Sequence, residues 1–132
     1  MDIAIERLRP EDTDAVFRLL EQNKLPLDGL REHLETTIVA RRNGEVVGIA
    51  ALEAYPDGVL MRSVAVAPGL HGQGLGHRLI DGVLQLARDI GATHAYLLTT
   101  TAERYFPKFG FERIDRQQVP ASVRTSVEST TP

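Results

Sequence analysis

The sequence contains no cysteine. Disulfide bonds, thiolate metal sites and any mechanism through a cysteinyl intermediate are therefore excluded. Positive charge is also in short supply, because 15 lysines and arginines against 18 aspartates and glutamates give a net charge of −3 at pH 7. A nucleic-acid partner requires a basic surface, so this composition argues against one.

Long apolar runs are missing as well. No stretch reaches the roughly 18 apolar residues that a membrane span needs. The N-terminal segment MDIAIERLRPED carries acids where a signal peptide has a basic segment and then an apolar one. We therefore expect a cytoplasmic protein without a membrane partner. The histidines do not have the spacing of metal ligands, which predicts that no metal is bound: His33, His71, His77 and His94.

What is present is typical of one soluble globular domain. Apolar residues make up 42% and charged residues 25% of the 132 positions. A chain of this length can bury one continuous core. We expect a single domain over 1–132, with a polar tail at about 120–132.

The first third of the chain predicts a strand and two helices. A strand is expected at 3–8, and Pro10 fits the first position of the helix that follows. LPLDGL (25–30) ends this helix, and a short second helix is expected around 30–34. The buried stripe of the first helix is Val16, Leu19 and Leu20.

The central part predicts an antiparallel meander. Asn43-Gly44 and Pro56-Asp57-Gly58 are turn signals between strand-like runs. The runs are 36–42, 45–55 and 59–68. 

After the meander, a helix with apolar residues at helical spacing is expected to end at Gly91. Its apolar positions are Leu75, Leu79, Val83, Leu86 and Ile90. The next strand, 94–101, must join the sheet through a right-handed parallel crossover. A helical piece at 102–106 and a last strand at 111–115 complete a mixed α/β fold. The expected sheet is mostly antiparallel, has six or seven strands and carries helices on both faces.

The segment 62–76, RSVAVAPGLHGQGLG, is the most informative part of the chain. A strand leads through a proline into a glycine-rich loop and then a helix. Gly74 and Gly76 allow the backbone to approach an anion, which the positive end of the helix dipole favours. The loop lacks the sequence of a P-loop and the glycine spacing of a dinucleotide-binding turn. The alternative interpretation is a tight strand-to-helix connection.

Two motifs resemble those of the GCN5-related N-acetyltransferase (GNAT) family. His71-Gly72-Gln73-Gly74-Leu75-Gly76 resembles the family's acetyl-CoA motif Arg/Gln-x-x-Gly-x-Gly/Ala, and AERYFPKFGF (102–111) resembles its A-x-x-F-Y-x-K-x-G-F signature. The resemblance implies the GNAT fold, with the fourth and fifth strands splayed apart, and acetyl-CoA as co-substrate. It also admits a homodimer, because homodimers are common in the family.

The resemblance further implies which residues contact the cofactor. Backbone amides of the loop would hold the CoA pyrophosphate, and the fourth strand would pair with the pantetheine arm. Thr99 and Phe106 fall at positions where relatives contact the cofactor. Phe106 replaces a tyrosine that often protonates the departing thiolate. One step along a helix rotates a side chain by about 100°, so the adjacent Tyr105 need not reach the same point and the acid is unassigned. The cofactor-binding residues are Val64, Ala65, Val66, His71, Gly72, Gln73, Gly74, Leu75, Gly76, Thr99 and Phe106.

Without cysteine, direct attack of an amine on the thioester is the simplest mechanism. Glu53 is the candidate base, because it lies within an otherwise apolar run near the end of the third strand, beside the expected thioester slot, where desolvation would raise its pKa. An outward-facing strand-end carboxylate is the alternative. Arg62 is a candidate grip for a substrate carboxylate or phosphonate, with a solvated strand arginine as its alternative. Leu27 is expected in the acceptor pocket or else in a helix–helix turn.

LPLDGL, LMRSVAVAP, YLLTTTA and VPASVRTSVES together resemble a narrower group. They are similar to the small acetyltransferases of arsenic-resistance operons, and these are similar to the acetyltransferase domain of N-acetylglutamate synthases. The resemblance implies a small amino-acid-like acceptor, glutamate-like or arsenic-containing, with Arg124 as a second carboxylate contact or an exposed tail residue. A non-catalytic CoA-binding module and a protein-directed acetyltransferase remain as alternatives.

Overall fold

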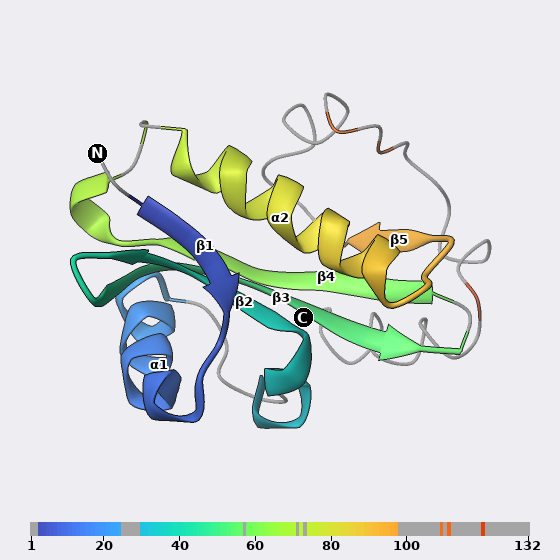
Figure 1. Ribbon diagram of the computed structural model, residues 1–132, viewed down its shortest axis with the longest axis horizontal. Helices are drawn as coiled ribbons and strands as arrows, with labels where there is room; N and C mark the ends of the chain where they lie inside the picture. The colour runs from blue at the N-terminus through green and yellow to red at the C-terminus, as the bar shows by residue number, and fades with distance from the viewer. Residues whose placement is uncertain are drawn as a thin grey trace.

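The computed structural model describes residues 3–24, 30–56, 58–70, 72, 74–97, 109, 111 and 120, with the side chains of 30–32 excepted. Within these ranges five strands form one mixed sheet in the order β1-β2-β3-β4-β5 (Figure 1). The strands are β1 (Ile3–Arg7), β2 (Thr37–Arg42), β3 (Glu45–Tyr55), β4 (Gly58–Val66) and β5 (Ala95–Leu97). β2, β3 and β4 form the predicted antiparallel meander, and β5 pairs parallel with β4, as predicted. β1 pairs antiparallel with β2.

The described sheet has fewer strands than the six or seven expected. Phe111 is described without regular structure, and the rest of the expected last strand, 112–115, lies outside the described residues. The expected helical piece at 102–106 lies outside them as well. The mixed α/β architecture itself is confirmed.

The β2–β3 hairpin forms where the turn chemistry predicts it. Asn43 and Gly44 have φ values of 52° and 81°. Positive φ at both central residues is the mark of a type I′ turn, whose twist matches that of the flanking strands. β3 consequently begins at Glu45 and ends at Tyr55, as predicted.

One face of the sheet is covered by α1 (Thr13–Gln22). A 3-10 turn, η1 (Pro10–Asp12), precedes it, so the predicted proline start belongs to this turn rather than to the α-helix. The predicted stripe of α1 is buried, and it packs against apolar side chains of β2, β3 and β4. The cluster consists of Val16, Leu19, Leu20, Val39, Ile49, Ala51 and Ala65.

The predicted short second helix is a 3-10 segment, η2 (Leu30–Thr36), interrupted by a kink at His33. η2 packs along β3 and directly precedes β2.

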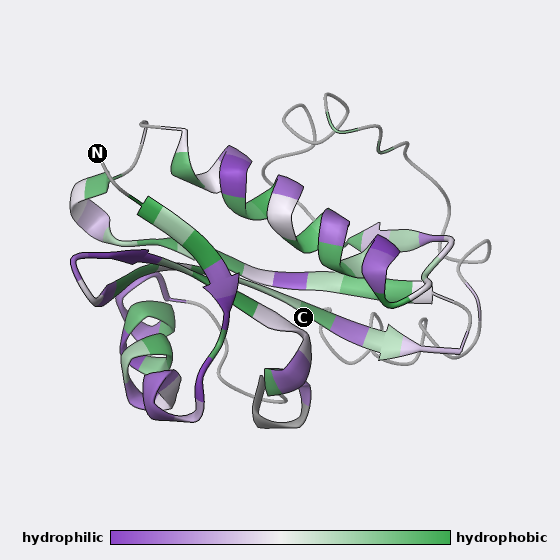
Figure 2. Cartoon of the chain, viewed as in Figure 1, coloured by the Kyte–Doolittle hydropathy of each residue, from purple (hydrophilic) through white to green (hydrophobic). Residues whose placement is uncertain are grey.

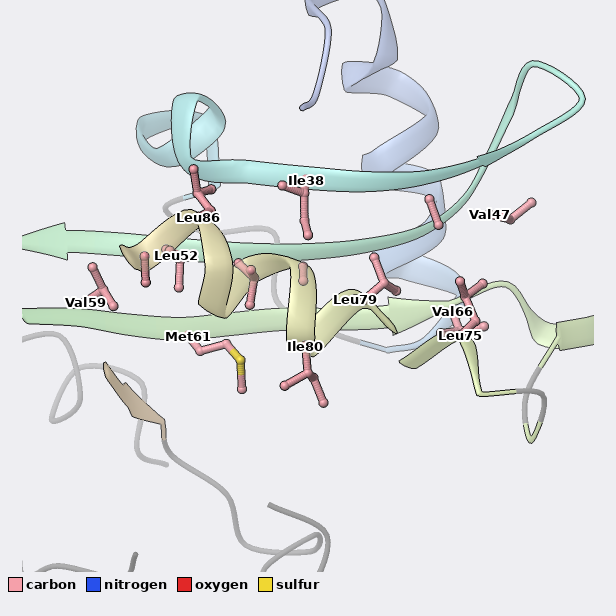
Figure 3. Close-up of a cluster of buried hydrophobic side chains, with 14 of the residues drawn as sticks. Ile38, Val47, Leu52, Val59, Met61, Val66, Leu75, Leu79, Ile80 and Leu86 are labelled. Atoms are coloured by element: carbon pink, nitrogen blue, oxygen red, sulfur yellow. The ribbon is translucent and has the colours of Figure 1, made fainter. Parts of the chain in front are cut away.

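The opposite face carries α2 (Leu75–Asp89), which lies across the sheet as Figure 1 shows. Its apolar residues face the strands and its polar residues face away (Figure 2). Figure 3 shows the resulting core, in which Leu79, Ile80 and Leu86 of α2 meet Ile38, Leu52 and Met61 of the sheet.

The end of α2 differs from the predicted stripe. The helix ends at Asp89, so Ile90 caps it and is 44% exposed instead of joining the core. Gly91 has a φ of 88° and its N–H reaches the Arg88 carbonyl at 3.0 Å, while the Ala92 N–H reaches the Ala87 carbonyl at 2.9 Å. These bonds form a glycine-terminated C-cap, as the sequence predicts for Gly91.

Arg41 on β2 ties the start of α1 to the sheet. Its guanidinium bonds Asp12 through both terminal nitrogens, at 3.1 and 2.7 Å, and Glu6 through Nε at 2.6 Å. This hydrogen-bonded cation holds the pKa of Asp12 below its usual value against the opposing effect of burial. The two acids in turn raise the pKa of Arg41. In the described ranges no helix is long and apolar enough to cross a membrane.

Candidate functional site

The glycine-rich loop lies between the end of β4 and the start of α2. The Ala67 N–H bonds the Val47 carbonyl at 2.8 Å and fixes the loop entrance. A 3-10 turn, η3 (Pro68–Leu70), follows, and Gly72 and Gly74 each have a φ of 81°. Side chains are strained at this φ, so the backbone path requires glycine there.

The start of α2 has the properties of an anion site. Gly74 is its N-cap and supplies no side-chain acceptor, and the first intrahelical bond runs from Arg78 N to Gly74 O at 3.2 Å. The first N–H groups of a helix have no intrahelical partner and carry partial positive charge. A Cβ at Gly72, Gly74 or Gly76 would meet nothing within 4 Å. The first turn of α2 holds no acidic residue, so its charge favours an anion.

β4 contains a bulge at Ser63 and Val64, just before the strand ends at Val66 and the loop begins. Arg62 pairs with Ala51 and Ala65 pairs with Ile49, which leaves Ser63 and Val64 opposite Ala50 alone. Ser63 has a φ of 59°. This extra residue is a β-bulge, a feature that bends a strand and re-aims side chains next to functional sites.

The described pairing of β4 with β5 stops before the bulge. It joins Val59–Met61 to Ala95–Leu97, while Val64–Val66 continue toward the glycine loop. Residues 98–100 lie outside the described residues, so the predicted splaying of these strands stays a prediction. The bulge that would produce it is present.

Glu53 lies inside the protein on the face of the sheet that α1 partly covers. It is 2% exposed, which excludes the outward-facing alternative. Its Oε2 atom accepts a hydrogen bond from Nη1 of Arg62, and its Oε1 atom accepts one from the Tyr55 hydroxyl at 2.5 Å. Nε2 of His33 lies 4.0 Å from Oε2.

Arg62 is equally part of this cluster. Its side chain is only 14% exposed, so the solvated-arginine alternative is excluded. Its Nε atom lies 3.2 Å from the Ser63 hydroxyl oxygen, which joins the ion pair to the bulge. A buried carboxylate is costly unless it is paired and hydrogen-bonded, and Arg62 and Tyr55 supply both conditions.

The sequence predicts separate roles for Glu53 and Arg62, and the structure brings them into one ion pair. Tyr55 and His33 next to Glu53 were not predicted. Tyr55 follows Glu53 by two residues on the same strand, so strand periodicity places both on one face. His33 comes from η2, and its approach to Glu53 depends on tertiary packing.

The other predicted site residues fall into two groups. The described ones lie at the end of β4, in the glycine loop and at the start of α2: Val64, Ala65, Val66, Gly72, Gly74, Leu75 and Gly76. The following lie outside the described residues: Leu27, His71, Gln73, Thr99, Tyr105, Phe106 and Arg124.

A cavity of about 540 Å³ lies at the other end of β4, between the β3–β4 turn and the α2–β5 connection. Its described lining includes Tyr55, Gly58, His94 and Tyr96, and none of the predicted site residues. Tyr55 is thus both a lining residue of this cavity and a hydrogen-bond donor to Glu53. Among the described residues, no group of three histidines or acids could hold a metal ion.

Comparison with known proteins identifies the family. A family model described as acetyltransferase (GNAT) family matches residues 1–111. An amino-acid acetyltransferase of Mycobacterium tuberculosis (strain ATCC 25618 / H37Rv) is 38% identical over 116 residues, covering 85% of this chain and 64% of that protein. The chain therefore spans less than two thirds of the length of this curated relative.

Two solved structures share the architecture. Rv2747 from Mycobacterium tuberculosis, in complex with CoA and NLQ, matches 98% of this chain and 83% of its own with a TM-score of 0.80 and 30% identity. N-acetylglutamate synthase from Neisseria gonorrhoeae, complexed with coenzyme A and N-acetyl-glutamate, matches 98% of this chain and 32% of its own. Its TM-score is 0.84, and at 23% identity the likeness concerns the fold.

The family match over residues 1–111 and the similarity to these relatives confirm the resemblance to the family. The chain belongs to the acetyltransferase (GNAT) family.

Proposed function

We propose that this protein is an acetyl-CoA-dependent N-acetyltransferase whose acceptor is a small α-amino acid. The observation that carries the proposal is the buried ion pair between Glu53 on β3 and Arg62 on β4. Arg62 directly precedes the bulge in β4, and β4 leads into the glycine loop. A single strand thus connects an anion site with a cluster of opposite charges.

The donor half of the proposal rests on the loop and on β4. Backbone N–H groups at Gly72–Gly76 would hold the pyrophosphate of CoA, with His71 and Gln73 in the same loop. The main chain of Val64–Val66 would pair with the pantetheine arm beyond the bulge. Thr99 and Phe106 remain proposed cofactor contacts. The relatives crystallised with CoA support acetyl-CoA as the donor.

The acceptor half rests on charge complementarity. An α-amino acid carries an ammonium group beside a carboxylate, and the Glu53–Arg62 pair presents the opposite charge to each. Arg62 can bond a carboxylate through two parallel N–H groups. Glu53 would attract the ammonium group and take one of its protons, which frees the nitrogen lone pair for attack.

The acceptor's identity is proposed more narrowly from the relatives. One relative is named an amino-acid acetyltransferase, and one neighbour is complexed with N-acetyl-glutamate. We extend the proposal to glutamate-like acceptors and to arsenic-containing or phosphinothricin-like analogues, with Leu27 in the acceptor pocket. The buried position of the ion pair favours a small molecule over a lysine on a protein surface.

A non-catalytic CoA-binding module is the second candidate. Phe106 favours it, because a tyrosine at this motif position often supplies the proton to the departing thiolate. A thiol with a reference pKa of about 8.5 is nevertheless a tolerable leaving group without an acid.

The test is an acceptor panel with the purified chain. Thiol release from acetyl-CoA would be followed together with mass spectrometry of the products. L-Glutamate, other α-amino acids and the arsenical and phosphinothricin-like analogues would be compared with matched amines that lack the α-carboxylate. We expect acetylation of α-amino acids and little or none of the matched amines. Binding of acetyl-CoA without turnover on any amine would support the module, and equal rates with and without the α-carboxylate would contradict the amino-acid proposal.

A further inference from the structure

His33 is held in place at a kink in η2. Its backbone angles, φ −124° and ψ 22°, are not helical. Its carbonyl oxygen accepts a hydrogen bond from the Thr37 hydroxyl at 2.8 Å, and the Thr36 hydroxyl lies 3.2 Å from the same oxygen. The Thr36 hydroxyl also lies 2.5 Å from the Leu52 carbonyl, next to Glu53 on β3. These contacts fix the histidine backbone beside the buried carboxylate.

The side chain of His33 is a partly exposed neighbour of this buried carboxylate. Nε2 lies 4.0 Å from Oε2 of Glu53, and the exposed fraction rises from 2% at the Glu53 side chain to 19% at the His33 side chain. A small rotation of the side chain would bring these two atoms to hydrogen-bond distance, or one water molecule would bridge them. Catalytic hydrogen bonds are often long before substrate binds.

The other described groups around Glu53 cannot carry a proton away at neutral pH. The guanidinium of Arg62 on β4 carries donors only and has no atom that accepts a proton. The Tyr55 hydroxyl on β3 already donates its hydrogen to Oε1. Histidine is the side chain whose charge changes near neutral pH, and its two ring nitrogens allow a proton to enter at one and leave at the other.

Acetylation of an ammonium group has to release one proton to solvent. The ammonium loses two protons as the N–C bond forms, the C–S bond of the thioester breaks, and the departing thiolate takes up one of them. If Glu53 accepts a proton in this step, as proposed above, it must lose that proton before the next turnover. Buried as it is, Glu53 needs a partner for this step.

We infer that His33 is the proton relay that returns Glu53 to its ionised form. Nε2 takes the proton from the Glu53 carboxyl group, and the opposite ring nitrogen releases a proton toward solvent. His33 is thus a positioning and relay residue that acts through Glu53, and the inference rests on the proposed acetyltransferase function.

The test compares His33→Ala with a matched control, His94→Ala, whose exposed ring lies in the α2–β5 connection and stacks on Tyr96. Acetyl transfer to the best acceptor of the panel would be measured from pH 6 to pH 9, with and without imidazole in the buffer. We expect His33→Ala to lower kcat about 10-fold or more with little change in the KM for acetyl-CoA, and added imidazole to restore much of the loss. The control should retain wild-type kcat and should not respond to imidazole.

His33→Gln provides a second variant that keeps side-chain volume and polarity without a titratable group. We expect the same low kcat from this variant, with little change in the KM for acetyl-CoA. Unchanged kcat in both variants, or a loss that imidazole does not restore in a folded variant, would overturn the relay. If the wild-type chain acetylates no amine at all, the proposed function fails instead, so the two failures are distinguishable.

Discussion

Replacing Arg62 with methionine should leave the buried Glu53 carboxylate without its cation, and this prediction tests the ion pair independently of catalysis. Removing one partner of a buried pair costs about 3–5 kcal/mol, because the remaining charge stays desolvated. The Arg62 side chain is 14% exposed and the Glu53 side chain 2% exposed, so most of the penalty falls on the carboxylate. We expect a loss near the lower limit, about 3 kcal/mol, because Tyr55 still donates to the carboxylate in the variant.

The companion substitution, Glu53→Gln, should have opposite effects in the two backgrounds. In the wild-type protein it replaces a charged hydrogen bond by a neutral one and should cost about 1–2 kcal/mol. In the Arg62→Met protein it removes the uncompensated charge and should restore about 1 kcal/mol or more. Lowering the pH should stabilise Arg62→Met relative to wild type, because protonation neutralises the same carboxylate.

Urea unfolding followed by circular dichroism would give the four free energies, with equal m values as the check on two-state behaviour. Because small domains have only about 5–15 kcal/mol of stability in total, Arg62→Lys serves as the variant that keeps the positive charge and the fold. Additive losses in the double variant, or a destabilising effect of Glu53→Gln in both backgrounds, would refute the reasoning.

Further predictions concern the loop, the acid network and the end of α2. Gly74→Ala and Gly44→Ala each introduce a side chain at a φ of 81° with nothing within 4 Å, so both should lower the free energy of unfolding in urea by about 1–2 kcal/mol. In calorimetry only Gly74→Ala should weaken acetyl-CoA binding. Equal affinities of the two variants would contradict the assignment of the glycine loop as the anion site. The lowered pKa of Asp12 means that its pairing with Arg41 stabilises the fold fully above the ordinary aspartate pKa of about 3.9 and less as pH falls through the folded-state value. Asp12→Asn should therefore cost about 2 kcal/mol at pH 7 and converge with wild type in acid, and a constant difference from pH 7 to pH 2 would contradict this. Ile90→Ser should change the unfolding free energy by less than about 0.5 kcal/mol, because Ile90 is 44% exposed, and a core-sized loss would return it to the buried stripe.

The strands and helices that the sequence predicted well are those bounded by strong local signals. β3 has its predicted limits because Asn43-Gly44 fixes one end and the turn before Gly58 fixes the other. α2 begins at the glycine loop and ends before Gly91 for the same reason. The 3-10 form of η2 had no such signal, because the kink at His33 is held by hydroxyls and by its packing against β3.

The Glu53–Arg62 pair was within reach of sequence reasoning. The turn that pairs Tyr55 with Gly58 sets the hairpin register, which places Arg62 opposite Ala51. Glu53 is then the diagonal neighbour of Arg62 on the same face, at a separation that a long side chain spans. The contact between His33 and Glu53 could not be predicted, because it depends on how η2 packs on the sheet, and sequence periodicity does not encode this packing.

The bulge at Ser63 reconciles the two requirements that β4 has to meet. Side chains alternate along a strand, so a regular β4 could not turn both Arg62 and Ala65 toward the same face. Ala65 packs in the α1 cluster and Val66 in the α2 core, while Arg62 meets Glu53 on the α1 face. One extra residue between them shifts the alternation by one, so the charged half of the strand and the apolar half next to the glycine loop are both oriented correctly. The backbone strain at Ser63 is therefore the cost of having the partner of Glu53 and the entrance to the glycine loop on a single strand.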